Sequence, residues 1–198
     1  MTTPERDETA RTSTFGDFSR LLPRSNVASY LAGAVPMLVG LPLVALWASR
    51  QVDTWLWPGR QLPTPVWLAG LVLLGVGLVL WLYAPTLLVL RGKGIPLEGY
   101  DGPVFEGTRK LVVSGPYRYI RNPMYTGYLS LIAALGIVGS SHFMLFAVFP
   151  VWCWWTRRFV IQREEVALAA RFGEPYLDYC RRVPRFLPGT PASGAVVK

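Results

Sequence analysis

The chain has 198 residues, of which 52% are hydrophobic and 16% charged, and its formal net charge at pH 7 is +8. A soluble domain carries about 25% charged residues, so this composition excludes an ordinary soluble protein and indicates an all-α polytopic membrane protein. The single histidine and the two cysteines lack the spacing of a zinc site, so we expect neither a bound metal nor a disulfide.

The N-terminal part is predicted to form a disordered tail followed by two membrane spans. Residues 1–24 mix Thr, Ser, acids and Arg with few large apolar side chains, which is typical of a disordered tail. Residues 25–90 contain two uncharged runs, 25–49 and 66–90, and each is long enough to cross a bilayer. Neither run has the form of a short apolar core followed by a cleavage site, so we expect no signal peptide.

The segments that flank the second span are predicted to be an outer and a cytoplasmic loop. Residues 51–65 form the expected outer loop, with tryptophans around it that are typical of the bilayer interface. Pro85 either kinks the end of the second span and opens a gap there, or is a proline that the membrane helix tolerates. Residues 91–121 are rich in glycine and are predicted to form an ordered cytoplasmic loop.

Residues 122–156 contain no Asp, Glu, Lys or Arg over 35 positions. One span needs about 20 apolar residues, so this run predicts a hairpin of two short spans with a tight turn at 139–142. Asn122 and Pro123 predict the helix start, with Asn as N-cap and Pro at the first helical position. The positive end of this helix then lies beside Arg118 and Arg121, an arrangement that attracts carboxylate or phosphate groups.

The basic residues are distributed asymmetrically around these four predicted spans. Of the 20 Lys and Arg, 18 fall on one side and two, Arg50 and Arg60, on the other. This is the positive-inside pattern, so we expect both termini in the cytoplasm and a location in a bacterial inner membrane. The same pattern explains the positive charge without a nucleic acid partner.

Glu164 and Glu165 directly follow the aromatic end of the fourth span, where acids are not needed to orient a helix. Apolar residues recur at helical spacing over residues 166–172, which predicts a short amphipathic helix on the membrane face. Considered alone, the two acids are most simply explained as ion-pair partners of nearby arginines on the same helix.

Residues 115–127, Gly-Pro-Tyr-Arg-Tyr-Ile-Arg-Asn-Pro-Met-Tyr-Thr-Gly, resemble the Arg-His-Pro-x-Tyr-x-Gly signature of the isoprenylcysteine carboxyl methyltransferase and phospholipid methyltransferase family. Residues 163–184 resemble that family's C-terminal block, in which a Glu-Glu pair precedes Leu, Phe-Gly, two Tyr and Val-Pro. The resemblance covers about residues 110–188, whereas the first two spans resemble nothing specific. It implies an integral membrane methyltransferase that uses S-adenosylmethionine and a lipid-like or isoprenoid acceptor bearing a carboxylate, amine or thiol.

The resemblance also implies a cofactor site built from the hairpin and the C-terminal segment, residues 122–188, before a flexible tail at 189–198. By position, the first motif matches Arg121, Pro123, Tyr125 and Gly127. Asn122 stands where the eukaryotic enzymes have His, and Asn does not titrate near neutral pH. The residues predicted to bind the cofactor are Tyr117, Arg118, Arg121, Asn122, Pro123, Tyr125, Gly127, Glu164 and Glu165. The residues predicted to be catalytic are Tyr125, Arg158 and Glu165.

The chemistry of the cofactor suits these residues. Arg121 and the helix N-terminus can bind its carboxylate, Glu164 or Glu165 its ammonium or ribose, and tyrosine rings its sulfonium. Alignment of nucleophile, methyl and sulfur can supply ~7–11 kcal/mol, so a site without His, Cys or metal is adequate. We expect the polar cofactor to enter from the cytoplasm and a lipid-like acceptor to enter from the bilayer, with Arg158 orienting its polar head.

Two other functions remain open at this point. Membrane sterol reductases that use NADPH carry a related motif, but a pair of acids suits an ammonium better than a phosphate. A non-catalytic membrane scaffold is the other alternative, and cofactor binding distinguishes it from an enzyme.

Overall fold

The computed structural model describes residues 36–92, 108 and 110–189, and within these ranges every regular element is a helix. The predicted N-terminal tail, the first part of the predicted first span (25–35), about half of the loop at 91–121 and the tail from 190 onward lie outside the described residues. The chain divides into two units, Met1–Leu43 and Val44–Lys198. The first contains η1 (Pro36–Gly40) and the first residues of α2 (Leu41–Leu56); the contacts below are all within the second.

The second predicted span is helix α3 (Thr64–Leu87), which continues into the π-helical turn η2 (Leu88–Gly92). Together these 29 residues, with a mean hydropathy of 2.3, are long and apolar enough to cross a membrane. In the described part of the chain no other helix meets both conditions, because the apolar helix α4 (Pro123–Val138) has only 16 residues. The all-helical fold is therefore confirmed, whereas the count of four spans is not.

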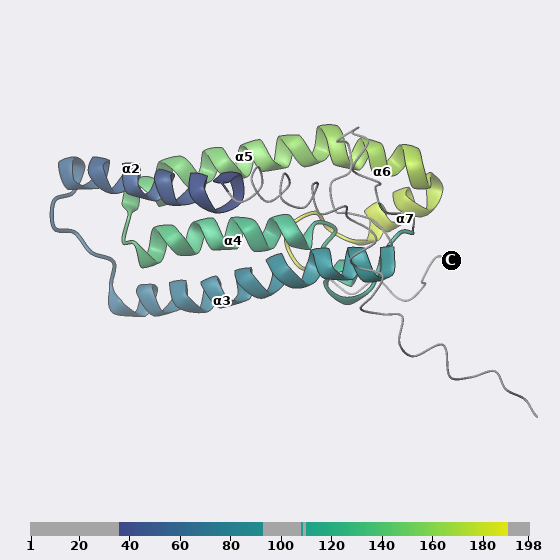
Figure 1. Cartoon of the computed structure of the whole chain (residues 1–198), viewed down its shortest axis with the longest axis horizontal. Coiled ribbons are helices and arrows are strands. Elements are labelled where there is room, and N and C mark those ends of the chain that lie inside the picture. The colour runs from purple at the N-terminus through teal and green to yellow at the C-terminus, as the bar shows by residue number, and fades with distance from the viewer. Residues whose placement is uncertain (1–35, 93–107, 109, 190–198) are drawn as a thin grey trace, which may run out of the picture. The chain divides into compact units, whose positions relative to one another are not determined.

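Helices α3 and α4 pack closely through two glycines. A Cβ atom placed on Gly127 of α4 would lie 2.6 Å from the backbone nitrogen of Trp81 and 2.8 Å from the carbonyl oxygen of Gly77. Small residues at such a contact let two helix backbones approach. As Figure 1 shows, α4 lies between α3 and α5 (Phe149–Phe159).

The turn predicted at 139–142 is present between α4 and η4 (Met144–Val148), and Asp53 of α2 binds it. The Ser141 hydroxyl and the Phe143 N–H donate to the Asp53 carboxylate at 2.5 and 2.8 Å, and Arg50 donates to the Gly139 carbonyl. The hairpin turn thus provides hydrogen-bond partners for the Arg50 and Asp53 side chains, and α2 continues to Leu56. The outer loop expected at 51–65 was therefore placed too early: its first six residues are helical.

The chain after α5 is helical as far as α7, apart from a break at Gly173. The π-helical turn η5 (Val160–Glu164) joins α5 to α6 (Glu165–Phe172), which confirms the predicted short helix. Gly173, at φ +61°, ends α6 and starts α7 (Glu174–Arg182). α7 buries Tyr176 and Tyr179 against α6 and the segment before α4.

Candidate functional site

The start of α4 is the centre of the site. A short 3-10 turn, η3 (Gly115–Arg118), leads into it, and Asn122 and Pro123 occupy the predicted N-cap and first helical positions. The Asn122 side chain makes no capping hydrogen bond, however. The residue is 9% exposed, and its Nδ2 has no partner among the described residues. The sequence thus predicts the helix start correctly but not the orientation of this amide.

Residues 184–189, here called the C-terminal strap, lie beside residues 119–122. The N–H groups of Arg121 and Asn122 donate to the carbonyls of Pro184 (2.8 Å) and Arg185 (3.1 Å), and the Gly189 N–H donates to the Tyr119 carbonyl (3.1 Å). The strap therefore binds the amides of the two residues that directly precede α4.

The amides without an acceptor inside the helix lie further along the first turn of α4. The Thr126 N–H already donates to the Asn122 carbonyl. Pro123 has no N–H, so the first-turn amides that lack an intrahelical acceptor are those of Met124 and Tyr125.

Glu164 faces inward from the last residue of η5. It is 6% exposed, and its Oε1 accepts a hydrogen bond from the Tyr125 hydroxyl at 2.5 Å. The Tyr125 ring lies 6.5 Å from the ring of Phe159. This contact joins the two family segments of the sequence, 39 positions apart, inside the helical hairpin.

An inner cavity of about 70 Å³ lies beside these groups, with Tyr117, Arg121, Asn122 and Glu164 in its wall. Six of the nine residues predicted to bind a cofactor line it: Tyr117, Arg121, Asn122, Pro123, Tyr125 and Glu164. Besides Asn122 Nδ2, the Nε of Arg121 is buried and has no partner within the described ranges. The cavity thus combines two unpaired donors with one buried carboxylate.

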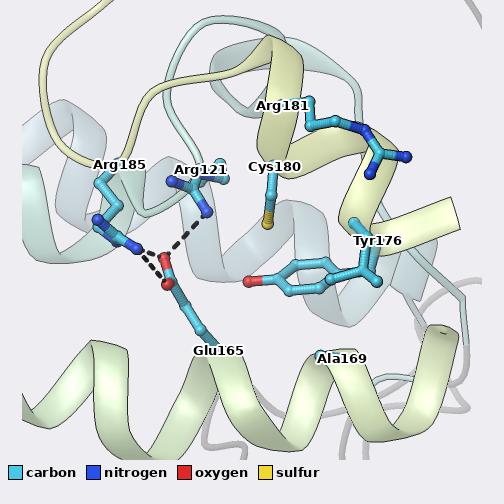
Figure 2. A pocket seen from close by; sticks show the side chains of 8 residues that line it. Arg121, Glu165, Ala169, Tyr176, Cys180, Arg181 and Arg185 are labelled. Carbon is cyan, nitrogen blue, oxygen red and sulfur yellow. Dashed lines mark hydrogen bonds and ion pairs between the residues drawn. The ribbon is translucent and has the colours of Figure 1, made fainter. Parts of the chain in front are cut away.

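Glu165 faces a second, outer pocket of about 400 Å³ (Figure 2). Its carboxylate accepts two hydrogen bonds of 2.8 Å from the guanidinium of Arg185 and lies 3.1 Å from Nη1 of Arg121. Arg121 and Tyr176 line both the inner cavity and the outer pocket. The two adjacent acids, treated as one pair in the sequence, therefore face different spaces.

The other predicted residues lie away from both cavities. Arg118 is exposed, and Gly127 is at the contact with α3. Arg158 is exposed at the end of α5, where its guanidinium lies 5.9 Å from the centre of the Trp154 ring.

The tyrosines of this region keep their protons at neutral pH. Burial raises the pKa values of Tyr117, Tyr176 and Tyr179 above the usual range of a phenol. The Tyr179 hydroxyl donates to the Tyr117 carbonyl at 2.7 Å, which ties α7 to the segment before α4. The bond to Glu165 raises the pKa of the Arg185 guanidinium, so this guanidinium stays charged.

Sequence reasoning missed three residues of the site: Tyr176, Tyr179 and Arg185. The two tyrosines belong to the C-terminal block and carried a signal, since that block contains two Tyr at the family spacing. Arg185 has no such signal, because nothing in the sequence distinguishes it from the other arginines near the predicted spans.

Comparisons with known proteins match both segments of the site. The sequence profile of the phospholipid methyltransferase family matches residues 66–175, which is more than half of the chain. Methanethiol S-methyltransferase 2 of Bradyrhizobium diazoefficiens is 29% identical over 154 residues, covering 67% of this chain and 53% of that protein. Protein-S-isoprenylcysteine O-methyltransferase of Mus musculus is 37% identical over 83 residues, covering 41% of this chain and 28% of that protein.

A solved structure supports the fold. The chain matches the eukaryotic intramembrane Ras methyltransferase, isoprenylcysteine carboxyl methyltransferase, with a TM-score of 0.61 at 22% identity, over 86% of this chain and 59% of that one. The chain thus spans between about a quarter and three-fifths of the length of these relatives. The profile match includes both the Arg121-Asn122-Pro123 motif and the Glu164-Glu165 pair, and we conclude that the chain belongs to the phospholipid methyltransferase family.

Proposed function

We propose that the protein is an integral membrane methyltransferase that transfers a methyl group from S-adenosylmethionine to a lipid-like acceptor. The observation that carries the proposal is the inner cavity. Two buried donors without partners among the described residues, Arg121 Nε and Asn122 Nδ2, line it together with the buried carboxylate of Glu164. A buried polar group without a partner costs about 1–3 kcal/mol, so a ligand that binds these donors offsets a cost already present in the fold.

The residues of the cavity fit the amino-acid end of the cofactor. The side chains of Arg121 and Asn122 and the amides of the first turn of α4 can donate to its carboxylate. Glu164 can accept from its ammonium. A volume of about 70 Å³ corresponds to roughly two water molecules at ~30 Å³ each, which is about the space that the carboxylate and the ammonium group need together. The rest of the cofactor needs the larger space beyond Arg121 and Tyr176.

The chain's own residues bind and orient the reactants. S-Adenosylmethionine supplies a methyl group on a sulfonium, and attack by an acceptor lone pair leaves the electrons of the broken S–C bond on sulfur. Tyr125 holds Glu164 in place through its hydroxyl. Tyr117, Tyr176 and Tyr179 remain neutral, so they provide aromatic faces and hydroxyls and add no charge.

We further propose that the acceptor enters from the bilayer. Large apolar side chains such as Val72, Val79 and Trp155 are exposed on α3 and α5, as lipid-facing side chains would be. In this arrangement α2, α3, α4 and the η4–α5 helix are the four spans, with both termini cytoplasmic. Arg158, exposed beside Trp154, is placed to orient the polar head of the acceptor.

Ligand-induced thermal stabilisation tests the proposal. S-Adenosylmethionine should raise the Tm of the purified protein, and Glu164→Gln should weaken its binding at least tenfold because a charge-assisted hydrogen bond is lost. Glu174→Gln is the matched control, since Glu174 is an exposed acid at the start of α7 and lies outside both cavities. Stabilisation by NADPH and not by S-adenosylmethionine would favour a reductase, and stabilisation by neither would favour a scaffold.

A further inference from the structure

All the hydrogen bonds and ion pairs described for the Glu165 side chain are with two arginines. Its side chain is 12% exposed, and its carboxylate accepts both forked hydrogen bonds of Arg185 as well as the ion pair with Arg121. Figure 2 shows the carboxylate between these two guanidinium groups. A carboxylate that is already bound on both oxygens has little capacity left for a further ligand.

Arg185 is bound at two places at once. Its guanidinium is held by Glu165 of α6, and its carbonyl accepts the N–H of Asn122 at the start of α4. The preceding carbonyl, that of Pro184, accepts the N–H of Arg121. One ion pair thus connects α6 to the residues that line the inner cavity.

Apart from the ion pair with Glu165, the described polar contacts of the C-terminal strap are hydrogen bonds of its backbone. Of its large apolar side chains, Leu187 is 77% exposed and Phe186 is only partly buried, and the fully buried Val183 lies just before the strap. The remaining described hydrogen bonds are those of the Gly189 N–H to Tyr119 and of the Thr126 hydroxyl to the Phe186 carbonyl, at 3.1 and 2.9 Å. Segments with little buried apolar surface open locally at low free energy, so the Glu165 ion pair has a large share in keeping the strap in place.

We propose that Glu165 is a positioning residue, which latches the C-terminal strap across the start of α4 and thereby holds Arg121 and Asn122 at the inner cavity. Glu164 is then the acid that meets the cofactor, and Glu165 acts through the two arginines. The part of this inference that concerns the cofactor rests on the proposed function. The latch itself is a property of the protein without any ligand.

Hydrogen exchange of the full-length protein tests the latch directly. Glu165→Gln and Arg185→Gln should each speed exchange of the amides of Arg121, Asn122 and Gly189 about tenfold, because each removes the forked charge-assisted bonds between Arg185 and Glu165. The double variant should exchange no faster than Glu165→Gln alone, which also loses the ion pair with Arg121. Arg185→Lys should restore most of the protection, and Arg181→Gln, which alters an exposed arginine paired with Asp178, should leave exchange unchanged. Unchanged exchange in Glu165→Gln or Arg185→Gln overturns the latch.

Enzyme kinetics with S-adenosylmethionine distinguish a positioning role of Glu165 from direct contact of Glu165 with the cofactor. They also distinguish it from a general loss of stability in the variants. Arg185→Gln should raise the KM for S-adenosylmethionine about tenfold and leave kcat at saturation nearly unchanged, whereas partial unfolding would lower the apparent kcat at constant KM. If Glu165→Gln weakened binding and Arg185→Gln did not, Glu165 would contact the cofactor and the inference would be wrong. A protein that binds no S-adenosylmethionine at all would overturn the proposed function, while the exchange experiment would still decide the latch.

Discussion

Asn122 begins α4 but leaves its own side-chain amide unpaired among the described residues. Its position could be predicted, because Asn before Pro is a strong helix-start pattern. The unpaired amide could not, since it depends on the strap, which binds the neighbouring backbone from more than 60 positions away.

Replacing Asn122 with leucine should separate stability from binding. Asn122→Leu removes a buried unpaired donor and keeps a side chain branched at Cγ, so the Tm of the ligand-free protein should stay equal or rise. Affinity for S-adenosylmethionine should fall at least tenfold, as measured by titration calorimetry. Gln162→Leu, which alters an exposed amide on η5, should change neither. A marked loss of ligand-free stability with unchanged affinity would show that the Asn122 amide is bonded within the protein.

The orientations of Glu164 and Glu165 could be predicted only in part. Successive residues of an α-helix point about 100° apart, so only one acid of the pair could face the hairpin interior. Which one does so depends on the π-helical turn η5, whose hydrogen bonds span five residues and shift the register of the residues that follow. No feature of the sequence at Val160–Glu164 predicts a π-helical turn.

The positions of the helices were easier to predict than the packing contacts between them. The uncharged run at 66–90 predicted α3, yet its nearly uniform apolar composition does not indicate which face meets α4. The glycines mark that face: Gly77 and Gly127 allow the approach, whereas a Cβ atom placed on Gly75 would have nothing within 4 Å. The extension of α2 past residue 50 was missed because Arg50 and Asp53 look like loop residues until the hairpin turn that binds them is known.

An alanine at position 127 should weaken the packing of α3 on α4. The added Cβ of Gly127→Ala meets backbone atoms, which cannot rotate away, so we expect a loss of about 1–3 kcal/mol in the free energy of unfolding. The matched control, Gly75→Ala, adds the same methyl group in open space on α3. It should be neutral or stabilising by up to about 1 kcal/mol, since Ala favours helix over Gly. Equal unfolding curves for the two variants, measured in detergent, would contradict this packing.

For the molecule as a whole, the order of apolar runs and basic residues predicts that both family segments lie on one side of the membrane. The structure brings these segments together through the hydrogen bond of Tyr125 to Glu164 and the ion pair of Arg121 with Glu165. The neighbourhood of the two motifs could be predicted, because a hairpin returns the chain to its starting side. The role of the strap could not be predicted, because it is bound through backbone hydrogen bonds, which do not depend on the pattern of side chains.

Labelling of single cysteines tests the membrane topology. In a background with Cys153→Ser and Cys180→Ser, we expect Arg60→Cys to react with an impermeant maleimide in spheroplasts and Arg118→Cys to react only in inverted vesicles. Both positions are exposed, so lack of reaction reflects the side of the membrane and not burial. Reaction of both cysteines from the same side would contradict the four-span arrangement and, with it, the cytoplasmic site.

The binding of Asp53 to the hairpin turn has a consequence for the order in which the chain assembles during translation. Ser141 is synthesised 88 residues after Asp53. The Asp53 carboxylate is therefore present long before the Ser141 hydroxyl and the Phe143 N–H, which donate hydrogen bonds to it in the folded protein. Until then Asp53 must stay hydrated, because an unpaired carboxylate is costly to bury. The last turns of α2 therefore dock late, when the hairpin arrives and supplies these donors.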